Sequence, residues 1–318
     1  MSTKRYDVLV VGELNVDIIL NDIDGFPEVG KEKLARRMVT TLGSSSAIFA
    51  SNLSSLGASV AFLGKVGADA HGDIVLNSLQ SQKVDTKFVL RDKQADTGAT
   101  LVLNYDEDRA MVTYPGAMER LTIDDISDEV LKQARHLHFS SYFLQPGLRP
   151  AVPELFRRAQ ALGLTTSLDP QWDPEERWEF DAAEILPHVD VFLPNEKELR
   201  YLTRTPNMHE ALASLSDYAQ RVVVKHGNRG SYTWQQHRLH HQPPFLNEHV
   251  VDAIGAGDSF NAGFIREFVR GGSLEACQTF GNLTGALSTT QSGGTAAFQD
   301  TDRLISLAQS KFNYALTL

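Results

Sequence analysis

One acidic residue follows a run of small residues in the segment VVDAIGAGDSFNAGFIREFVRGG, residues 250–272. Gly255, Ala256 and Gly257 precede Asp258, and the pattern that follows predicts an amphipathic helix with a phenylalanine stripe. Small residues at a helix start leave its first N–H groups accessible to an anion. Asp258 has two possible roles. It can complement the helix dipole, or it can accept a proton from a hydroxyl group while these amides hold the phosphoryl group that the hydroxyl attacks.

Further polar residues stand where predicted strands end and helices begin. Asn15 and Asp17 follow the first apolar run, YDVLVVG, where they are typical of a turn. Asn195 and Glu198 in LPNEKE are typical of a helix cap and a first-turn acid. Each pair therefore has an ordinary structural explanation as well as a chemical one.

Several other site types are excluded by their spacing. GKV at residues 64–66 lacks the upstream glycine and the Ser or Thr of a P-loop, and no G-x-G-x-x-G follows a strand. The histidine pairs 136/138 and 240/241 lack partners at zinc-ligand spacing. A local anion site at Asp258 remains the strongest signal.

The segment GSSSAIFASN, which begins at Gly43, predicts a helix with one misplaced apolar residue. Phe49 and Leu53 form its apolar stripe, whereas Ile48 lies on the polar face near Ser44. A single apolar residue on a helix surface is common and by itself needs no cause.

Composition limits the classes of function. The chain has 318 residues, enough for a sizeable core, and a net charge of -10, which argues against a general nucleic-acid or anionic-membrane surface. The single cysteine, Cys277, lies in a helical pattern, forms no internal disulfide and is expected in the core. Polar residues interrupt the N-terminal apolar run, which indicates a buried strand rather than a signal peptide, and no window is long enough for a membrane span. We expect a cytoplasmic protein.

Short β-branched runs alternate with helical patterns along the chain. Predicted helices at 148–162, 195–203 and 208–219 serve as crossovers between strands buried on both faces, which indicates an α/β fold with a doubly wound, mainly parallel sheet. Residues 30–42 and 96–114 instead resemble antiparallel strands, the latter around the turn NYDEDR. We expect one domain, residues 1–318, with these two segments forming a small β lid.

The motifs together resemble the ribokinase-like (PfkB) family of carbohydrate kinases, whose order they follow over nearly the whole chain. They are GELNVD, a glycine-led helix ending in LSSLGASVAFLGKVGADAHGD, TGATLVL, LPNEKE, VVVKHGNRGSY and DAIGAGDSFNAG. Each motif alone is weak evidence for the family, whereas the whole set in this order is specific to it.

The resemblance assigns roles residue by residue. It makes Asp258 the catalytic base and Gly255, Ala256 and Gly257 the anion hole. It places Asn15, Asp17, Gly43, Ser44 and Ile48 at the sugar, and Asn195, Glu198, Lys225, Gly227 and Asn282 at the nucleotide, with Glu198 also organising Mg²⁺ through water. It aligns Asp252, Ile254, Ser288, Gln291 and Gly293 with loops that hold a monovalent cation.

The chain departs from the family pattern at three positions. Ala253 replaces the usual Thr of the anion-hole motif, which removes a hydroxyl and leaves the amides. Ser44 replaces the second glycine of the glycine-led helix, and Ile48 replaces an Asn that hydrogen-bonds the sugar in relatives. The identity of the acceptor is therefore open.

The resemblance implies an ATP-dependent kinase that phosphorylates a primary hydroxyl of a small carbohydrate, with ATP, Mg²⁺ and potassium as cofactors. Two alternatives stay open: a nucleoside kinase of the same family, and a non-catalytic relative that binds sugar or nucleotide. We expect no nucleic-acid or membrane partner, and a homodimer formed through the lid strands.

Overall fold

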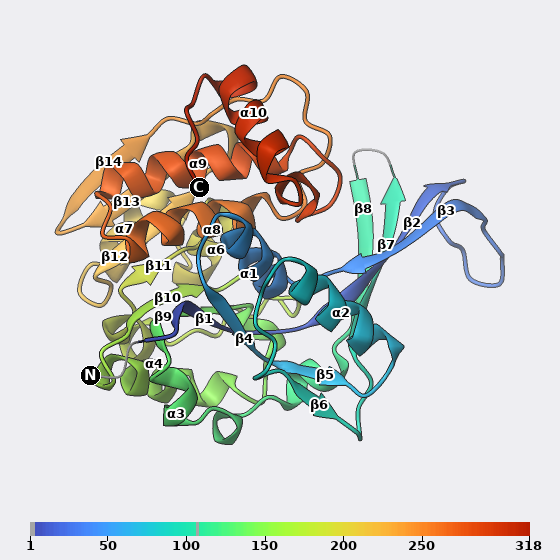
Figure 1. The fold of residues 1–318 in the computed structure, drawn as a ribbon, viewed down its shortest axis with the longest axis horizontal. Helices are drawn as coiled ribbons and strands as arrows, with labels where there is room; N and C mark the ends of the chain where they lie inside the picture. The colour runs from blue at the N-terminus through green and yellow to red at the C-terminus, as the bar shows by residue number, and fades with distance from the viewer. Residues whose placement is uncertain (1–3, 106–107) are drawn as a thin grey trace.

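The computed structural model describes residues 4–105 and 108–318, whose strands form one large sheet and two small ones (Figure 1). The large sheet has the order β14-β13-β12-β11-β10-β9-β1-β4. Its strands are β1 (Tyr6–Val11), β4 (Val60–Leu63), β9 (Ala134–Ser140), β10 (Thr165–Asp169), β11 (Val191–Phe192), β12 (Arg221–Lys225), β13 (Ser231–Gln235) and β14 (Arg238–Gln242). Neighbours from β4 to β12 are parallel, and only β12-β13 and β13-β14 are antiparallel. The predicted mainly parallel sheet is confirmed.

Helices cover both faces of this sheet because successive strand residues point to opposite sides. Val8 and Val10 belong to one buried cluster, and Leu9 and Val11 belong to the other. Helices of the first cluster are α1 (Ser45–Ser55), α2 (Ala70–Ser81), α8 (Ala256–Val269), α9 (Leu274–Ser288) and α10 (Thr301–Phe312). Helices of the second are α3 (Asp128–Leu131), α4 (Val152–Ala161), α5 (Ala182–Ile185), α6 (Glu196–Thr203) and α7 (Met208–Leu215). The three predicted crossover helices correspond to α4, α6 and α7, although α4 begins later than expected, after a 3₁₀ turn at Arg149–Ala151, and α7 ends earlier.

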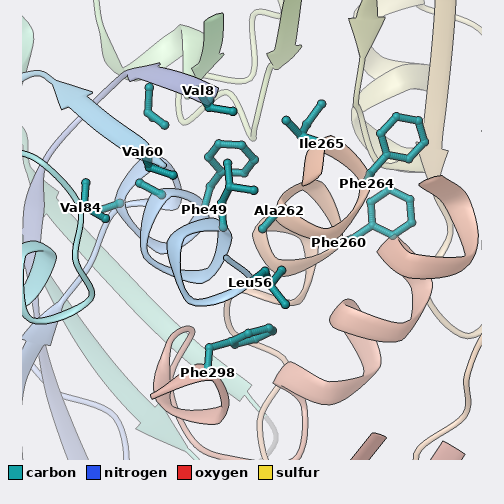
Figure 2. Close-up of a cluster of buried hydrophobic side chains, with 14 of the residues drawn as sticks. Val8, Phe49, Leu56, Val60, Val84, Phe260, Ala262, Phe264, Ile265 and Phe298 are labelled. Carbon is teal, nitrogen blue, oxygen red and sulfur yellow. The ribbon is translucent and has the colours of Figure 1, made fainter. Parts of the chain in front are cut away.

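The packing of α1 against α8 forms much of the first cluster. Figure 2 shows Phe49 of α1, and Leu56 directly after this helix, beside Ala262 and Ile265 of α8. Cys277 of α9 belongs to the same cluster, as expected for a core residue, and burial raises the pKa of its thiol to about 12. Among the described residues, none of the helices combines the length and apolar character that crossing a bilayer requires.

The polar face predicted for α1 is not a solvated surface. Ser51 and Asn52 are fully buried, and Ile48 is 5% exposed. The Asn52 side chain donates to Ser259 Oγ on α8 and to the carbonyl of Gly294, both at 2.9 Å. The alternative of a solvated helix surface is therefore excluded for this face, because α8 and the loop before α10 cover it with hydrogen-bonding partners.

The segments predicted to form a β lid lie in a four-stranded sheet of order β3-β2-β7-β8, called the lid below, that projects from one side of the molecule (Figure 1). Its strands are β2 (Asn15–Ile23), β3 (Ala35–Leu42), β7 (Gly98–Tyr105) and β8 (Asp108–Tyr114). Strand β2 was not predicted from the sequence. It does not continue β1, because the chain changes direction at residues 12–14, and it pairs instead with β3 and β7. Residues 30–34 are outside the strands, and the centre of the predicted NYDEDR turn, residues 106–107, lies outside the described residues. The third sheet pairs β5 (Lys65–Gly67) with β6 (Leu90–Asp92).

Candidate active site

The carboxyl ends of the parallel strands bring polar side chains to one edge of the large sheet. β10 ends at Asp169, β12 ends at Lys225, and Asn195 follows β11. Asp258 lies at the same edge, because Gln171, two residues beyond β10, donates from Nε2 to Asp258 Oδ1 at 2.9 Å. In doubly wound sheets, ligands bind at this edge.

The start of α8 presents backbone N–H groups beside Asp258. Gly255 caps the helix with φ 71°, a left-handed conformation that glycine adopts without strain, and no side chain caps the first turn. The amide of Ala256 donates to the carbonyl of Ala253 at 3.2 Å, whereas no acceptor within residues 4–105 and 108–318 receives the amides of Gly257 and Asp258. The helix start therefore retains two amides that can hold an anion.

Asp258 is a buried carboxyl group with an unusual protonation equilibrium. Burial and the negative charge of Asp169 raise its pKa well above the ordinary value, against the opposing effect of Lys225. Neither the local pattern nor the family motif indicated this shift in pKa, since proton acceptance needs only a carboxylate close to the hydroxyl. A raised pKa makes Asp258 a stronger base than an exposed aspartate once it is ionised.

Asp169 and Lys225 form a buried ion pair behind Asp258. Lys225 Nζ lies 2.6 Å from Asp169 Oδ2, and the side chains are 11% and 0% exposed. Asn261 of α8 donates to the same carboxylate oxygen and accepts from Lys225 Nζ at 3.3 Å. Although burial alone would lower it, the charges of Asp169 and Glu198 raise the pKa of Lys225, so that the ammonium remains a fixed positive charge.

Asn195 and Glu198 fulfil the structural role that their spacing predicts. The Asn195 side chain accepts from the Glu198 amide at 2.9 Å, and Glu198 Oε2 accepts from the Asn195 amide at 2.8 Å, which completes a capping box at the start of α6. Burial and Asp169 raise the pKa of Glu198 to about 7. An isolated parallel β-bridge pairs Asn195 with Lys225, so the start of α6 lies beside the end of β12 at the sheet edge.

A cavity of about 310 Å³ opens from the start of α8. The residues predicted to contact a nucleotide, Lys225, Gly227 and Asn282, line it together with Ala256 and Gly257. Asn282 is buried rather than exposed on its helix. Its side chain donates to the carbonyls of Gln242 and Pro243 at 3.1 and 2.9 Å, which holds the segment after β14 against α9 as a wall of the cavity.

Three of the residues predicted to contact the acceptor lie together where β2 begins and β3 ends, namely Asn15, Asp17 and Gly43. Asn15 Nδ2 donates to Asp17 Oδ1 at 3.2 Å and to Thr100 Oγ1 of β7 at 2.9 Å. A Cβ on Gly43 would lie 2.3 Å from Asp17 Oδ1, so only glycine fits here. Burial raises the pKa of Asp17 to about 6, against opposing effects from Asn15 and Arg109.

Ser44 supports the start of α1. Its Oγ donates to the Glu13 carbonyl at 2.6 Å and accepts from the Ala47 amide at 3.0 Å. Ser44 has φ 71°, a conformation that favours the glycine it replaces, and these hydrogen bonds hold it there. Glu13 is buried with its carboxylate on Ser44 and Ser46, and burial raises its pKa.

Ile48 contacts the glycines around the start of α8. A Cβ on Gly294 would lie 2.6 Å from Ile48 Cδ1, and one on Gly255 would lie 3.1 Å from Ile48 Cγ2. Ile48 therefore packs directly against the residue that caps α8, and any larger residue at Gly294 would displace it.

A family model described as pfkB family carbohydrate kinase matches residues 5–301. The chain belongs to the PfkB family of carbohydrate kinases. The resemblance inferred from the ordered motifs is confirmed.

Curated relatives of this PfkB-family chain include sugar and nucleoside kinases. An ATP-dependent ribose-1-phosphate kinase of Halopiger xanaduensis is 30% identical over 292 residues, covering 91% of this chain and 94% of that protein. A nucleoside kinase of Methanothermobacter thermautotrophicus is 25% identical over 316 residues, covering 99% of each.

Solved structures agree with the fold. An adenosine kinase from Sinorhizobium meliloti is 26% identical with a TM-score of 0.81, covering 94% of this chain and 99% of that one. The Arabidopsis thaliana ribokinase complexed with ribose and ATP is 25% identical with a TM-score of 0.83, covering 95% and 98%. The chain is thus a ribokinase-type member of a family of sugar and nucleoside kinases.

Asp169, Gln171 and Asn261 are residues of this PfkB-family site that the sequence analysis missed. An acidic residue at the end of the buried strand TTSLD was the available signal for Asp169. Asn261 was visible as a polar residue in the predicted helix after Asp258, but the carboxylate it contacts comes from another strand. Gln171 lies in a loop, and nothing in its neighbours indicated a contact with Asp258.

The two loops predicted to hold a monovalent cation lie side by side. Asp252 Oδ1 accepts from the Ile254 amide at 2.9 Å, and Oδ2 accepts from the Gly293 amide at 3.0 Å. The Gln291 amide donates to the Ser288 carbonyl at 3.5 Å. Asp252 thus joins the loops, and the cation site itself stays a prediction.

The pKa of Asp17 gives a test of acceptor binding. If the ionised carboxylate accepts hydrogen bonds from acceptor hydroxyls, the KM for the acceptor should fall roughly tenfold between pH 5 and 7, because the ionised fraction rises through a pKa of about 6. Asp17→Asn should flatten this dependence. Asp22→Asn, an exposed change on the same strand, is the matched control, and a pH-dependent KM in Asp17→Asn would assign the effect to another group.

Proposed function

We propose that this protein is an ATP-dependent kinase that transfers the γ-phosphoryl group to a primary hydroxyl of a small carbohydrate. The observation that carries the proposal is a buried Asp258 in the first turn of α8 beside the amides of Gly257 and Asp258 and the adjoining cavity. A carboxylate next to N–H groups at a helix start suits proton removal and phosphoryl stabilisation at one place.

The residues present fit ATP and Mg²⁺. The cavity of about 310 Å³ is within the usual size of ligand sites, and it ends at the amides of α8 and at Lys225. Glu198, with Asn195, supplies oxygen ligands of the kind Mg²⁺ accepts through water. When bound, ATP supplies the phosphoryl group and Mg²⁺ neutralises its charge.

In the proposed mechanism, Asp258 takes the proton from the acceptor hydroxyl as the acceptor oxygen forms its bond to the γ-phosphorus. The bond from that phosphorus to its bridging oxygen breaks and leaves ADP. Gln171 orients Asp258 Oδ1 through its 2.9 Å hydrogen bond, and Lys225 provides a nearby positive charge. The lid strands exclude water, whose attack would waste ATP.

A nucleoside kinase is the second candidate, and one feature favours it. A cavity of about 460 Å³ adjoins the acceptor residues through Thr113, which is 3.0 Å from Thr100 Oγ1. Its walls include Met111, Phe143 and Leu144. These apolar side chains suit an uncharged planar substituent on the sugar.

An acceptor screen tests both candidates. Purified protein would receive ATP and Mg²⁺ with pentoses, hexoses, sugar acids, sugar phosphates or nucleosides, and ADP release would be measured. We expect a simple carbohydrate to give the highest kcat/KM. A clear preference for a nucleoside would replace the first proposal by the second, and thermal stabilisation by ligands with no turnover would favour a non-catalytic binding protein.

Ile48→Asn should shift the acceptor preference toward a simple pentose or hexose. The introduced amide can hydrogen-bond a sugar hydroxyl, and one such bond of net worth ~1 kcal/mol corresponds to about a fivefold gain in kcat/KM. Ile48→Val keeps the site apolar and is the matched control. An unchanged acceptor profile in Ile48→Asn would limit Ile48 to packing against Gly255 and Gly294.

We also propose a homodimer formed through the lid. Met38, Val39, Met111 and Val112 on lid strands are 66%, 51%, 59% and 68% exposed. Such an exposed apolar sheet favours pairing with a second copy. Light scattering should give about twice 35.2 kDa, and Val112→Lys should lower this mass.

Val29→Lys changes an exposed apolar residue outside the lid strands and should leave the mass at that of the dimer. A monomer mass for the unmodified protein at working concentrations would contradict the proposed dimer.

A further inference from the structure

A cavity of about 570 Å³ between the 170–178 loop and α6 has an aromatic wall that phosphoryl transfer does not use. Trp172 and Tyr201 line it and are 41% and 51% exposed. Trp178 supports both: its ring is stacked on Tyr201 with centroids 5.1 Å apart, and it meets Trp172 edge-on at 4.8 Å. The wall therefore offers a continuous aromatic surface on which a planar ring can pack.

The remaining wall of this cavity is basic. Arg177, Lys197, Arg200 and Arg204 line it, whereas Glu176 is the acidic residue of the lining. Arg177 and Arg200 pair with Glu175 and Glu196 on their own segments. Over residues 4–105 and 108–318, no carboxylate forms an ion pair with Lys197 or Arg204, and the buried Nε of Arg200 has no hydrogen-bond partner. Lys197 and Arg204 are exposed, and their positive charge suits an anionic ligand at this wall.

The loop that carries this aromatic wall also contacts the catalytic carboxylate. Gln171, which donates to Asp258, is the neighbour of Trp172. Gln171 and Trp178 have φ of 59° and 54°, an uncommon conformation for such residues. Asp173 holds the loop by accepting from the Glu175 and Trp178 amides at 2.9 and 2.7 Å. A ligand that shifts Trp172 would therefore shift Gln171.

We propose that this cavity is a second binding site for an anionic ligand with a planar aromatic ring, of the nucleoside monophosphate class, and that its occupancy changes the orientation of Asp258 through Gln171. The ring packs on Trp172 and Tyr201, and the phosphate meets Lys197 and Arg204. Binding is independent of the proposed kinase function, whereas the effect on Asp258 rests on it.

Calorimetry tests the site directly. The full chain would first be saturated with a non-hydrolysable ATP analogue and Mg²⁺, to fill the nucleotide cavity, and then titrated with AMP, adenosine or inorganic phosphate. We expect saturable binding of AMP and at least tenfold weaker binding of adenosine and phosphate, which each lack one of the two features. Absence of AMP binding, or equal binding of phosphate and AMP, would overturn the proposal.

Variants locate the site. Trp172→Leu and Arg204→Asn should each weaken AMP binding at least tenfold; Asn suits position 204 because its φ is 54°. Arg204→Lys, which keeps the charge, should bind AMP more tightly than Arg204→Asn. Arg303→Asn on the exposed face of α10 is the matched control and should bind as the unmodified protein does. Equal affinity in all variants would place AMP elsewhere.

Activity tests the connection to Asp258. Saturating AMP should change kcat of the unmodified kinase by at least twofold, and Arg204→Asn should keep the basal kcat while losing this response. An AMP-bound protein with unchanged kcat would overturn the connection through Gln171. If no acceptor is found, the kinase proposal fails, and the calorimetric result still decides the binding site.

Discussion

Asp258→Asn is expected to reduce ATP-dependent phosphorylation by about 10²–10⁴-fold, the usual contribution of a positioned general base. The amide cannot take the hydroxyl proton, whereas the α8 amides and the cavity remain in place. Binding of a non-hydrolysable ATP analogue, measured by calorimetry, should therefore be retained. Because burial disfavours the ionised form of Asp258, the variant should also fold at least as stably as the unmodified protein.

The control for Asp258→Asn separates base chemistry from the helix dipole. Asp302 also lies in the first turn of a helix, α10, so Asp302→Asn removes a comparable dipole interaction without touching the site. It should keep full activity. If Asp258→Asn retained most of its activity, Asp258 would be a helix-start acid only, and the proposed mechanism would be wrong.

The parts of the site that could be predicted from the sequence are those whose residues are neighbours along the chain. The Gly255–Asp258 segment joins a small-residue helix start to a carboxyl group, so local rules and the family motif both indicated it. Asn195 and Glu198 likewise form a capping box within one turn. Their arrangement follows from backbone geometry, which the sequence specifies locally.

The parts that could not be predicted depend on contacts between distant segments. Three side chains from different segments meet only at the folded sheet edge. Asp169 of β10 and Asn261 of α8 contact Lys225, and Gln171 of the loop after β10 contacts Asp258. The raised pKa of Asp258 depends on the same contacts. Burial of α1 on its polar side depends on a distant contact in the same way, because α8 supplies the partner of Asn52.

The strands of the lid could be predicted from the sequence only in part. Its β7 and β8 strands were indicated by β-branched alternation in one continuous segment, whereas β2 was hidden because it follows β1 after a short polar interruption. The register that places Asp17 beside Thr100 is a parallel pairing between segments far apart in the chain. Periodicity predicts that a segment is a strand, but not which sheet it joins.

Asp169→Asn should be the most destabilising change at the site. It leaves Lys225 buried without the carboxylate that lies 2.6 Å away, and breaking a buried ion pair in this way costs about 3–5 kcal/mol of unfolding free energy. Denaturant unfolding of the ligand-free protein measures the loss. Replacing both partners in Lys225→Met/Asp169→Asn should cost less than the sum of the single changes, because no unpaired ammonium remains. If the loss of unfolding free energy in the double variant equalled the sum of the two single losses, Asp169 and Lys225 would not be energetically coupled.

The same change connects stability to catalysis. The charge of Asp169 raises the pKa of Asp258, so its removal should lower that pKa. A base with a lower pKa ionises at lower pH, and the acidic limb of the kcat/KM profile should therefore move to lower pH in Asp169→Asn. Asp190→Asn is the control, because it removes a partly buried carboxylate that accepts from the Thr166 amide at the opposite, amino end of β10. It should leave the profile in place. An unshifted profile in Asp169→Asn would mean that Asp258 does not set the acidic limb, whatever the change does to the stability of the ion pair.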